Sequence, residues 1–295
     1  MVLRTRNDIE EIDYGAVYVA PAVRSKFPEY DERGRMRLSV SRMQLFEKCP
    51  LAFKLSYIDH LDLSEDDESR ERLDKGKELH DLFYESAFQN YPEIVRAQEI
   101  YGKFPEHGEN FIWLQGEFAR IYGDHRPMYA EKEIIDYDDF VVLYVDRIND
   151  IGDGTVEILD YKTGKVGPLS KHEFQLALYT YYVEKHMGLR VSKWSIFFSK
   201  DKKYKSIDVN RAKVRMIPEI IRIVRDKIDE AFSVGGFYMR PNTLCSYCSL
   251  LQFGLCKSSP NKSYNCFGLL DIYSKDWNTP DSDVRYVCGG IRVTR

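Results

Sequence analysis

The segment from residue 140 to residue 164 constrains the fold more than any other part of the chain. Residues 140–146 and 155–159 are rich in β-branched and aromatic side chains, and Asp153-Gly154 between them has the composition of a two-residue turn. We therefore predict a β-hairpin in which Asp146 and Asp160 lie at neighbouring strand ends. Lys162 follows Asp160 by two residues, so the two-residue repeat of a strand places both side chains on one face.

Two carboxylates and an ammonium group on one surface suit the metal-assisted hydrolysis of phosphodiesters. Carboxylate oxygens favour Mg²⁺ or Mn²⁺, such an ion lowers the pKa of a water molecule, and a lysine can stabilise charge that develops on phosphate. An Asp-x-Lys sequence alone is more often part of a solvated hairpin. The interpretation therefore depends on the motifs that surround it.

Helices are expected before the hairpin. Ser41 is a predicted N-cap for the first, Cys49 lies on its apolar stripe, and Pro50 should kink or divide it. A second, amphipathic helix near residues 75–88 carries His80, and helical sequence continues over 91–123. A single helical histidine is more often structural than a ligand, and a lone buried cysteine is usually inert.

After the hairpin, a helix is expected from residue 171 to residue 184, with Gln175 and Tyr179 on one face because they are four residues apart. A strand over 194–198, a short strand near Ile207 and a long helix over about 211–232, interrupted at Pro218, follow. The chain has a net charge of −4, but residues 190–215 hold nine Lys or Arg against two Asp. This basic segment is either a nucleic-acid backbone contact or a solvated rim, and its central lysines are Lys200, Lys202, Lys203 and Lys205.

A cysteine cluster lies near the carboxyl end. The amino terminus lacks a signal-peptide core and no apolar run approaches the roughly 20 residues of a membrane span, so a cytoplasmic chain is expected. In that compartment Cys-x2-Cys at Cys245 and Cys248 indicates metal or cluster binding rather than a disulfide. A structural zinc site is one interpretation, with ligands Cys245, Cys248, Cys256 and Cys266.

In this order the motifs resemble those of the PD-(D/E)xK nuclease superfamily. They more narrowly resemble its RecB-like branch, which includes AddB-type nucleases and the iron–sulfur, CRISPR-associated exonucleases of the fourth Cas family. The resemblance implies an α/β fold with a restriction-endonuclease-like α-β-β-β-α-β core, a helical amino-terminal part and a Cys-rich carboxy-terminal staple. The nuclease domain would span 38–256, with a helical insertion at about 74–123, a catalytic core at about 129–232 and a Cys cluster at 245–256. Residues 1–37 would form an arm, and 257–295 a tail without an assigned role.

The resemblance also implies roles for individual residues. His80, Asp146, Asp160 and the Tyr161 carbonyl would hold Mg²⁺ or Mn²⁺, and Lys162 would position water or stabilise the phosphate. Gln175 and Tyr179 would brace the site and contact DNA, while Glu131 is a secondary candidate. A [4Fe–4S] cluster, with zinc as the alternative, would be held by Cys49, Cys245, Cys248 and Cys256. One departure is Leu143, which stands where the family often has glycine.

The function implied is a DNA nuclease, acting as an exonuclease on single-stranded DNA or DNA ends in recombination, repair, replication or CRISPR-type processing. The chain has no Walker-type phosphate loop, so a helicase or recombination protein would be a separate partner. Two other classes stay open: a non-catalytic DNA-binding or assembly subunit with a nuclease fold, and a structural interaction protein stapled by zinc.

Overall fold

The computed structural model describes residues 29–60, 74, 76–81, 83–84, 87, 102, 105–234, 236–240 and 245–248. The chain divides into two compact units made of interleaved segments. One unit comprises 1–66, 138–141 and 218–295, and the other comprises 67–137 and 142–217. Most of the predicted arm, the whole predicted tail, Cys256 and Cys266 lie outside the described residues. No helix in the described ranges is long and apolar enough to cross a membrane.

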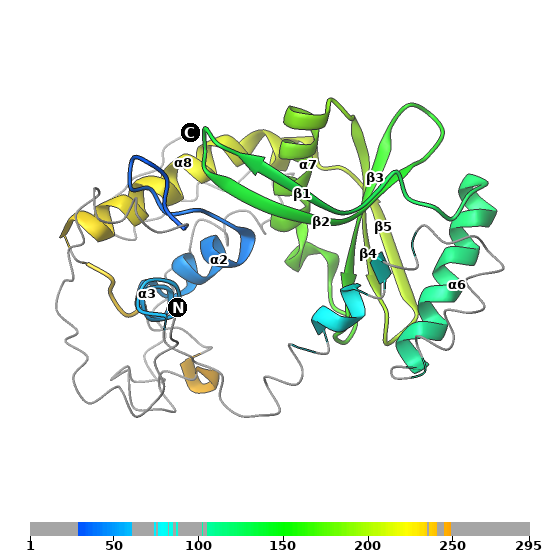
Figure 1. Cartoon of the computed structure of the whole chain (residues 1–295), viewed down its shortest axis with the longest axis horizontal. Coiled ribbons are helices and arrows are strands. Elements are labelled where there is room, and N and C mark those ends of the chain that lie inside the picture. Colours follow the sequence, from blue (N-terminus) through cyan, green and yellow to red (C-terminus); the bar gives the residue numbers. More distant parts are fainter. Residues whose placement is uncertain are drawn as a thin grey trace, which may run out of the picture. The chain divides into compact units, whose positions relative to one another are not determined.

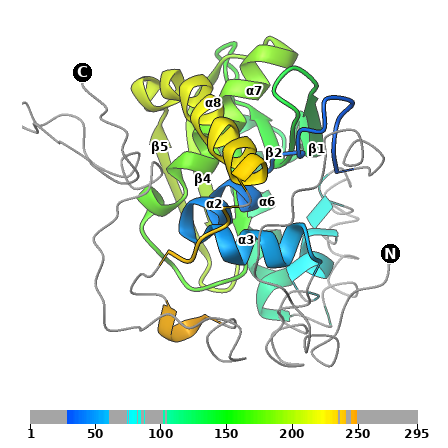
Figure 2. The ribbon, with the colours of Figure 1, turned by 90° about the vertical axis from the view of Figure 1, so that its left-hand side faces the viewer.

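The first unit contains two short helices, α2 (Val40–Lys48) and α3 (Pro50–Tyr57), shown in Figure 2. The predicted break between them is confirmed, because Pro50 opens α3, where its missing N–H would have no helical partner. The predicted cap at Ser41 is wrong. Ser39 is the N-cap, with an extended backbone and a hydroxyl that accepts from the Arg42 amide, so Ser41 lies inside the helix.

The core of this unit is aromatic. Phe53 packs edge-on against Phe46 with ring centroids 5.2 Å apart, and it stacks on Phe237 at 6.3 Å. Phe232 meets Phe237 edge-on at 5.2 Å. Phe232 belongs to α8 (Arg211–Val234), which has its first residues in the second unit and continues in the first from Pro218. The predicted interruption does not occur, since the helix continues through the proline.

The second unit is built on a sheet of five strands in the order β1-β2-β3-β4-β5 (Figure 1). The strands are β1 (Tyr129–Asp136), β2 (Val141–Asp150), β3 (Val156–Lys162), β4 (Val191–Phe198) and β5 (Lys203–Asp208). The pairs β2–β3 and β4–β5 are antiparallel, and β3–β4 is parallel. With α6 (Pro105–Tyr122) before β1 and α7 (Glu173–Met187) between β3 and β4, the element order confirms the predicted α-β-β-β-α-β core. The described part also has two short 3₁₀ helices, η3 (Leu169–Lys171) and η4 (Cys245–Tyr247).

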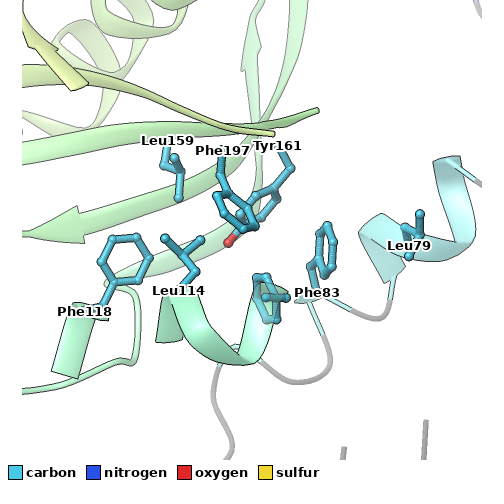
Figure 3. Close-up of a cluster of buried hydrophobic side chains, with 8 residues drawn as sticks. Leu79, Phe83, Leu114, Phe118, Leu159, Tyr161 and Phe197 are labelled. Atoms are coloured by element: carbon cyan, nitrogen blue, oxygen red, sulfur yellow. The ribbon is translucent and has the colours of Figure 1, made fainter. Parts of the chain in front are cut away.

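The sheet has two faces with different partners, because successive strand residues alternate. On one face, side chains of β3 and β4 pack on α6 and on Leu79 and Phe83, and Figure 3 shows this buried cluster. It contains Leu79, Phe83, Phe111, Leu114, Phe118, Leu159, Tyr161 and Phe197. The opposite face meets α7, where the indole N–H of Trp194 donates to Thr180 at 2.7 Å. We call these the α6 face and the α7 face.

The central hairpin differs from its prediction in two ways. Residues 151–155 connect β2 and β3, so the turn has five residues rather than two, with left-handed backbone at Gly152 and Gly154. Arg147 and Leu159 form the last pair of this register, so Asp146 and Asp160 are the next residues of the two strands. Asp146 lies within β2 rather than at its end, but it is near Asp160 as predicted, since the charge of Asp160 raises its pKa.

Candidate active site

Three side chains from separate elements of the second unit converge at one place. They are His80 from the helical residues 76–81, Glu131 from β1 and Asp146 from β2. His80 Nδ1 lies 3.3 Å from Glu131 Oε1 and 3.8 Å from Asp146 Oδ2. Among the described residues, only this group of three potential metal ligands has its donor atoms within 4.8 Å of one another. The structure thus brings together two predicted ligands and the secondary candidate.

Glu131 reaches this position through an unusual backbone conformation. It lies in β1 with φ of 44°, in the left-handed region that costs an L-residue about 1–2 kcal/mol. Such strain is concentrated at functional sites, where the surrounding structure holds it. Neither a glycine nor a proline in the sequence indicates this left-handed conformation.

A second group surrounds Asp160. Lys162 Nζ lies 2.6 Å from Asp160 Oδ2, as their common face predicts. From α7, Gln175 Nε2 donates to Asp160 Oδ1 at 2.8 Å and to the Tyr179 hydroxyl at 2.7 Å. Lys162 Nζ also lies 3.4 Å from Gln175 Oε1. Four predicted site residues therefore form one hydrogen-bonded group, although Asp160 is outside the three-residue group around His80.

The two groups meet through the strand backbone. The Tyr161 amide donates to Asp146 Oδ2 at 2.7 Å, so β3 fixes the orientation of the β2 carboxylate. The Tyr161 carbonyl stays a predicted metal ligand. Because the side chain of Tyr161 points to the α6 face, its backbone is held by the buried aromatic cluster in Figure 3.

Negative charge is crowded here. Burial, followed by the charges of Asp160 and Glu131, raises the pKa of Asp146 to about 8. Burial alone would lower the pKa of His80, but the hydrogen bond that His80 donates to Glu131 and the charge of Asp146 raise it on balance. Burial and then the charges of Asp146 and Asp160 hold the pKa of Tyr179 well above its ordinary value, so its hydroxyl remains a neutral donor.

These residues fit a divalent cation. Asp160 Oδ2 is buried and accepts no hydrogen bond, although the Lys162 ammonium is close to it. A buried oxygen without a hydrogen bond is costly, and a cation would satisfy it. A cation would also relieve the repulsion that raises the pKa of Asp146. Three carboxylates with one imidazole suit Mg²⁺ or Mn²⁺.

A buried polar network supports the hairpin from the α6 face. Arg147 and Glu157 are fully buried, and Asn149 bridges them, accepting from Arg147 Nε at 2.6 Å and donating to Glu157 at 2.7 Å. Arg147 also donates to Gln115 at 2.7 Å, and its guanidinium lies over the Phe118 ring. Because Arg147 directly follows Asp146, this network fixes the strand that carries the carboxylate. Sequence reasoning did not identify it, since an arginine in a strand is ordinarily exposed.

The cysteine prediction receives no support from the described residues. Cys49, Cys245 and Cys248 are half-buried and not in disulfides. They do not form a group of three with donor atoms within 4.8 Å. Cys256, the fourth predicted thiolate, lies outside the described residues.

Comparison with known proteins agrees with the fold. The sequence model of the PD-(D/E)XK nuclease superfamily matches residues 37–253. A crystal structure from Eubacterium rectale, reported as "Putative exonuclease", superimposes with a TM-score of 0.50 at 11% identity, covering 83% of this chain and 94% of that one. No curated protein matches the chain. The match over 37–253 extends through every element of the sheet, and the chain belongs to the PD-(D/E)XK nuclease superfamily.

Proposed function

We propose that the chain is a metal-dependent deoxyribonuclease that hydrolyses phosphodiester bonds at the α7 face. The observation that carries the proposal is the convergence of His80, Glu131 and Asp146 beside the Asp160–Lys162 pair. Membership of a nuclease superfamily supports the reaction class. The RecB-like motifs support DNA as substrate, in single strands or at ends, and exonuclease action.

In the proposed mechanism, His80, Glu131, Asp146 and Asp160 would hold one or two Mg²⁺ or Mn²⁺ ions. Such an ion would neutralise negative charge on the phosphate and would lower the pKa of a water molecule. Gln175 holds the Asp160 carboxylate by one oxygen, which leaves Oδ2 directed into the site.

Lys162 has the role of contacting the reacting phosphate. Its ammonium group lies on the same face as the carboxylates and is only partly exposed, so water screens its charge incompletely. There it can orient a water molecule or donate to a non-bridging phosphate oxygen as negative charge develops. Tyr179, which keeps its proton, holds Gln175 against both Asp160 and Lys162.

The test is degradation of end-labelled single- and double-stranded DNA with Mg²⁺ or Mn²⁺. The matched variants are Asp160→Asn and Asp150→Asn, of which the second lies on exposed β2 surface. Metal-dependent cleavage that is lost only in Asp160→Asn supports the proposal, and the product ladder reports direction. DNA binding without cleavage by the parent protein would instead indicate a DNA-binding subunit. Iron, sulfide and zinc analysis of anaerobically purified protein tests the predicted [4Fe–4S] cluster and its zinc alternative.

A further inference from the structure

A set of exposed lysines borders the candidate active site. Because β3 and β4 are parallel, with Lys162 opposite Phe198, the loop after β3 and the turn after β4 leave the same edge of the sheet (Figure 1). The first residue of that turn is tied to the site, since the Ser199 amide donates to the Lys162 carbonyl at 2.9 Å. The lysines are all exposed, and we call them the basic rim: Lys165, Lys171, Lys200, Lys202 and Lys203.

The charge of this rim is largely uncompensated. Residues 163–172 and 199–203 together contain these five lysines and one acid, Asp201. Asp201 accepts from the Val166 amide at 2.8 Å, and so it joins the two loops rather than pairing with a lysine. A chain with a net charge of −4 therefore presents a concentrated positive edge beside Lys162.

The rim is held rigidly. The buried Ser199 hydroxyl lies 2.8 Å from His107 Nδ1, and Asn110 donates to the Ser199 carbonyl at 2.8 Å, so α6 fixes the turn. Lys205 donates to the Gly167 carbonyl at 2.9 Å and fixes the other loop. A rigid surface loses little entropy when it binds, which favours an extended anionic partner.

The backbone conformation and the side-chain contact of Lys202 both set this lysine apart from an ordinary turn residue. It has a left-handed backbone with φ of 50°, which glycine adopts without strain. Its ammonium lies 5.0 Å from the Trp113 ring centroid, so the side chain is directed along the surface of α6.

We propose that the basic rim binds the phosphodiester backbone of the substrate strand directly beside the cleaved phosphate. Lys165 is three residues beyond Lys162, about 10 Å along an extended chain, so it lies within reach of a neighbouring nucleotide. The contacts are to phosphates, so they are independent of base sequence and weaken with salt. This inference rests on the proposed function, because it places the substrate of the same site.

The test compares two double variants of equal charge change. Lys200→Gln with Lys203→Gln removes two rim charges, and Arg190→Gln with Lys193→Gln removes two at the opposite end of β4. Both are made in an Asp160→Asn background, which stops cleavage. Anisotropy of a labelled single-stranded oligonucleotide gives the dissociation constant as a function of KCl concentration.

Each phosphate contact with a single strand contributes a slope of about 0.7, so the rim variant should lower the slope of log K against log salt by about 1.4. Its affinity near 0.1 M salt should fall about 10- to 30-fold, and the control variant should match the parent. If the rim and control variants give equal slopes while the parent binds and the wild type cleaves, the basic rim does not bind the substrate backbone. The proposed function would still stand in that case. A parent that does not bind nucleic acid, together with a wild type that does not cleave it, would refute the proposed function itself.

Unfolding midpoints and circular-dichroism spectra that match those of the Asp160→Asn parent establish that both variants are folded. Should the first rim variant fail to fold, Lys165→Gln with Lys171→Gln removes the same charge from the other loop. It carries the same expected change in slope, and an unchanged slope there overturns the proposal equally.

Discussion

Replacing Asp146 with asparagine should stabilise the metal-free protein while it removes metal binding. Burial and the neighbouring carboxylates raise the pKa of Asp146 from 3.8 to about 8, so at pH 7 folding requires the uptake of a proton. At 1.36 kcal/mol per pKa unit, the cost at pH 7 is on the order of 4 kcal/mol. Asparagine has the same shape and keeps an oxygen that can accept from the Tyr161 amide, but it never carries a charge.

The raised pKa of Asp146 also predicts how the stability difference between Asp146→Asn and wild type changes with pH. The protonated carboxyl stabilises the fold fully below pH 4, and this contribution is lost as the pH rises toward 8. In urea unfolding with EDTA, the advantage of Asp146→Asn should therefore be on the order of 4 kcal/mol at pH 7 and about 2 kcal/mol at pH 5. Asp150→Asn, on the exposed surface of the same strand, should differ from wild type by less than about 0.5 kcal/mol.

Adding Mn²⁺ should reverse the order of stability, because only wild type keeps the ligand. A Mn²⁺ concentration of about 10,000 times the dissociation constant would stabilise wild type by about 5.5 kcal/mol, which exceeds the advantage of about 4 kcal/mol that metal-free Asp146→Asn has at pH 7. Two results would contradict this prediction. One is a metal-free Asp146→Asn that is less stable than wild type at pH 7, and the other is a stability advantage of equal size at pH 7 and pH 5.

Three further substitutions test separate parts of the site. Lys162→Met should slow single-turnover cleavage about 10²- to 10³-fold while Mn²⁺ affinity stays within about tenfold, and a loss of Mn²⁺ binding would contradict the role given to the ammonium. Gln175→Leu should weaken Mn²⁺ binding about 10- to 100-fold in calorimetry, because Asp160 loses the donor that orients it, and an unchanged affinity would count against that role. Arg147→Met should lower the free energy of unfolding by about 3–5 kcal/mol, since it leaves a buried polar network without its cation. The exposed Arg126→Met serves as its control and should cost less than about 1 kcal/mol in the same urea titration.

The part of the fold that could be predicted is the part set by short-range periodicity. The two-residue repeat places Asp160 and Lys162 together, and the four-residue spacing places Gln175 and Tyr179 together, so each pair meets as expected. The length of the β2–β3 connection was not predictable from Asp153-Gly154. Gly152 also takes a left-handed conformation, and the hydrogen bond from the Ile151 amide to the Thr155 carbonyl closes a wider turn.

The site itself depends on contacts between elements, and local patterns carry little information about these. The sequence makes Glu131 only a secondary candidate because a carboxylate on a strand is ordinarily exposed, and no glycine or proline indicates its left-handed backbone beside His80. Arg147 was not identified because an arginine on a strand is likewise ordinarily exposed. Its partners Gln115 and Asn149 come from α6 and from its own strand, and only the assembled α6 face shows that an arginine can be buried there.

Successive side chains of β2 and β3 lie on opposite faces of the sheet, so one hairpin can carry both the candidate site and the contacts that stabilise it. Asp146 and Asp160 face α7, where crowded carboxylates work against stability, while Arg147, Glu157 and Tyr161 face α6, where each of the three is hydrogen-bonded or packed in the buried cluster. Each unfavourable side chain is therefore flanked in sequence by a residue that anchors the same strand. A substitution on the α6 face should act first on stability and only then on metal affinity. A substitution on the α7 face should act in the reverse order, as the contrasting expectations for Arg147 and Asp146 require.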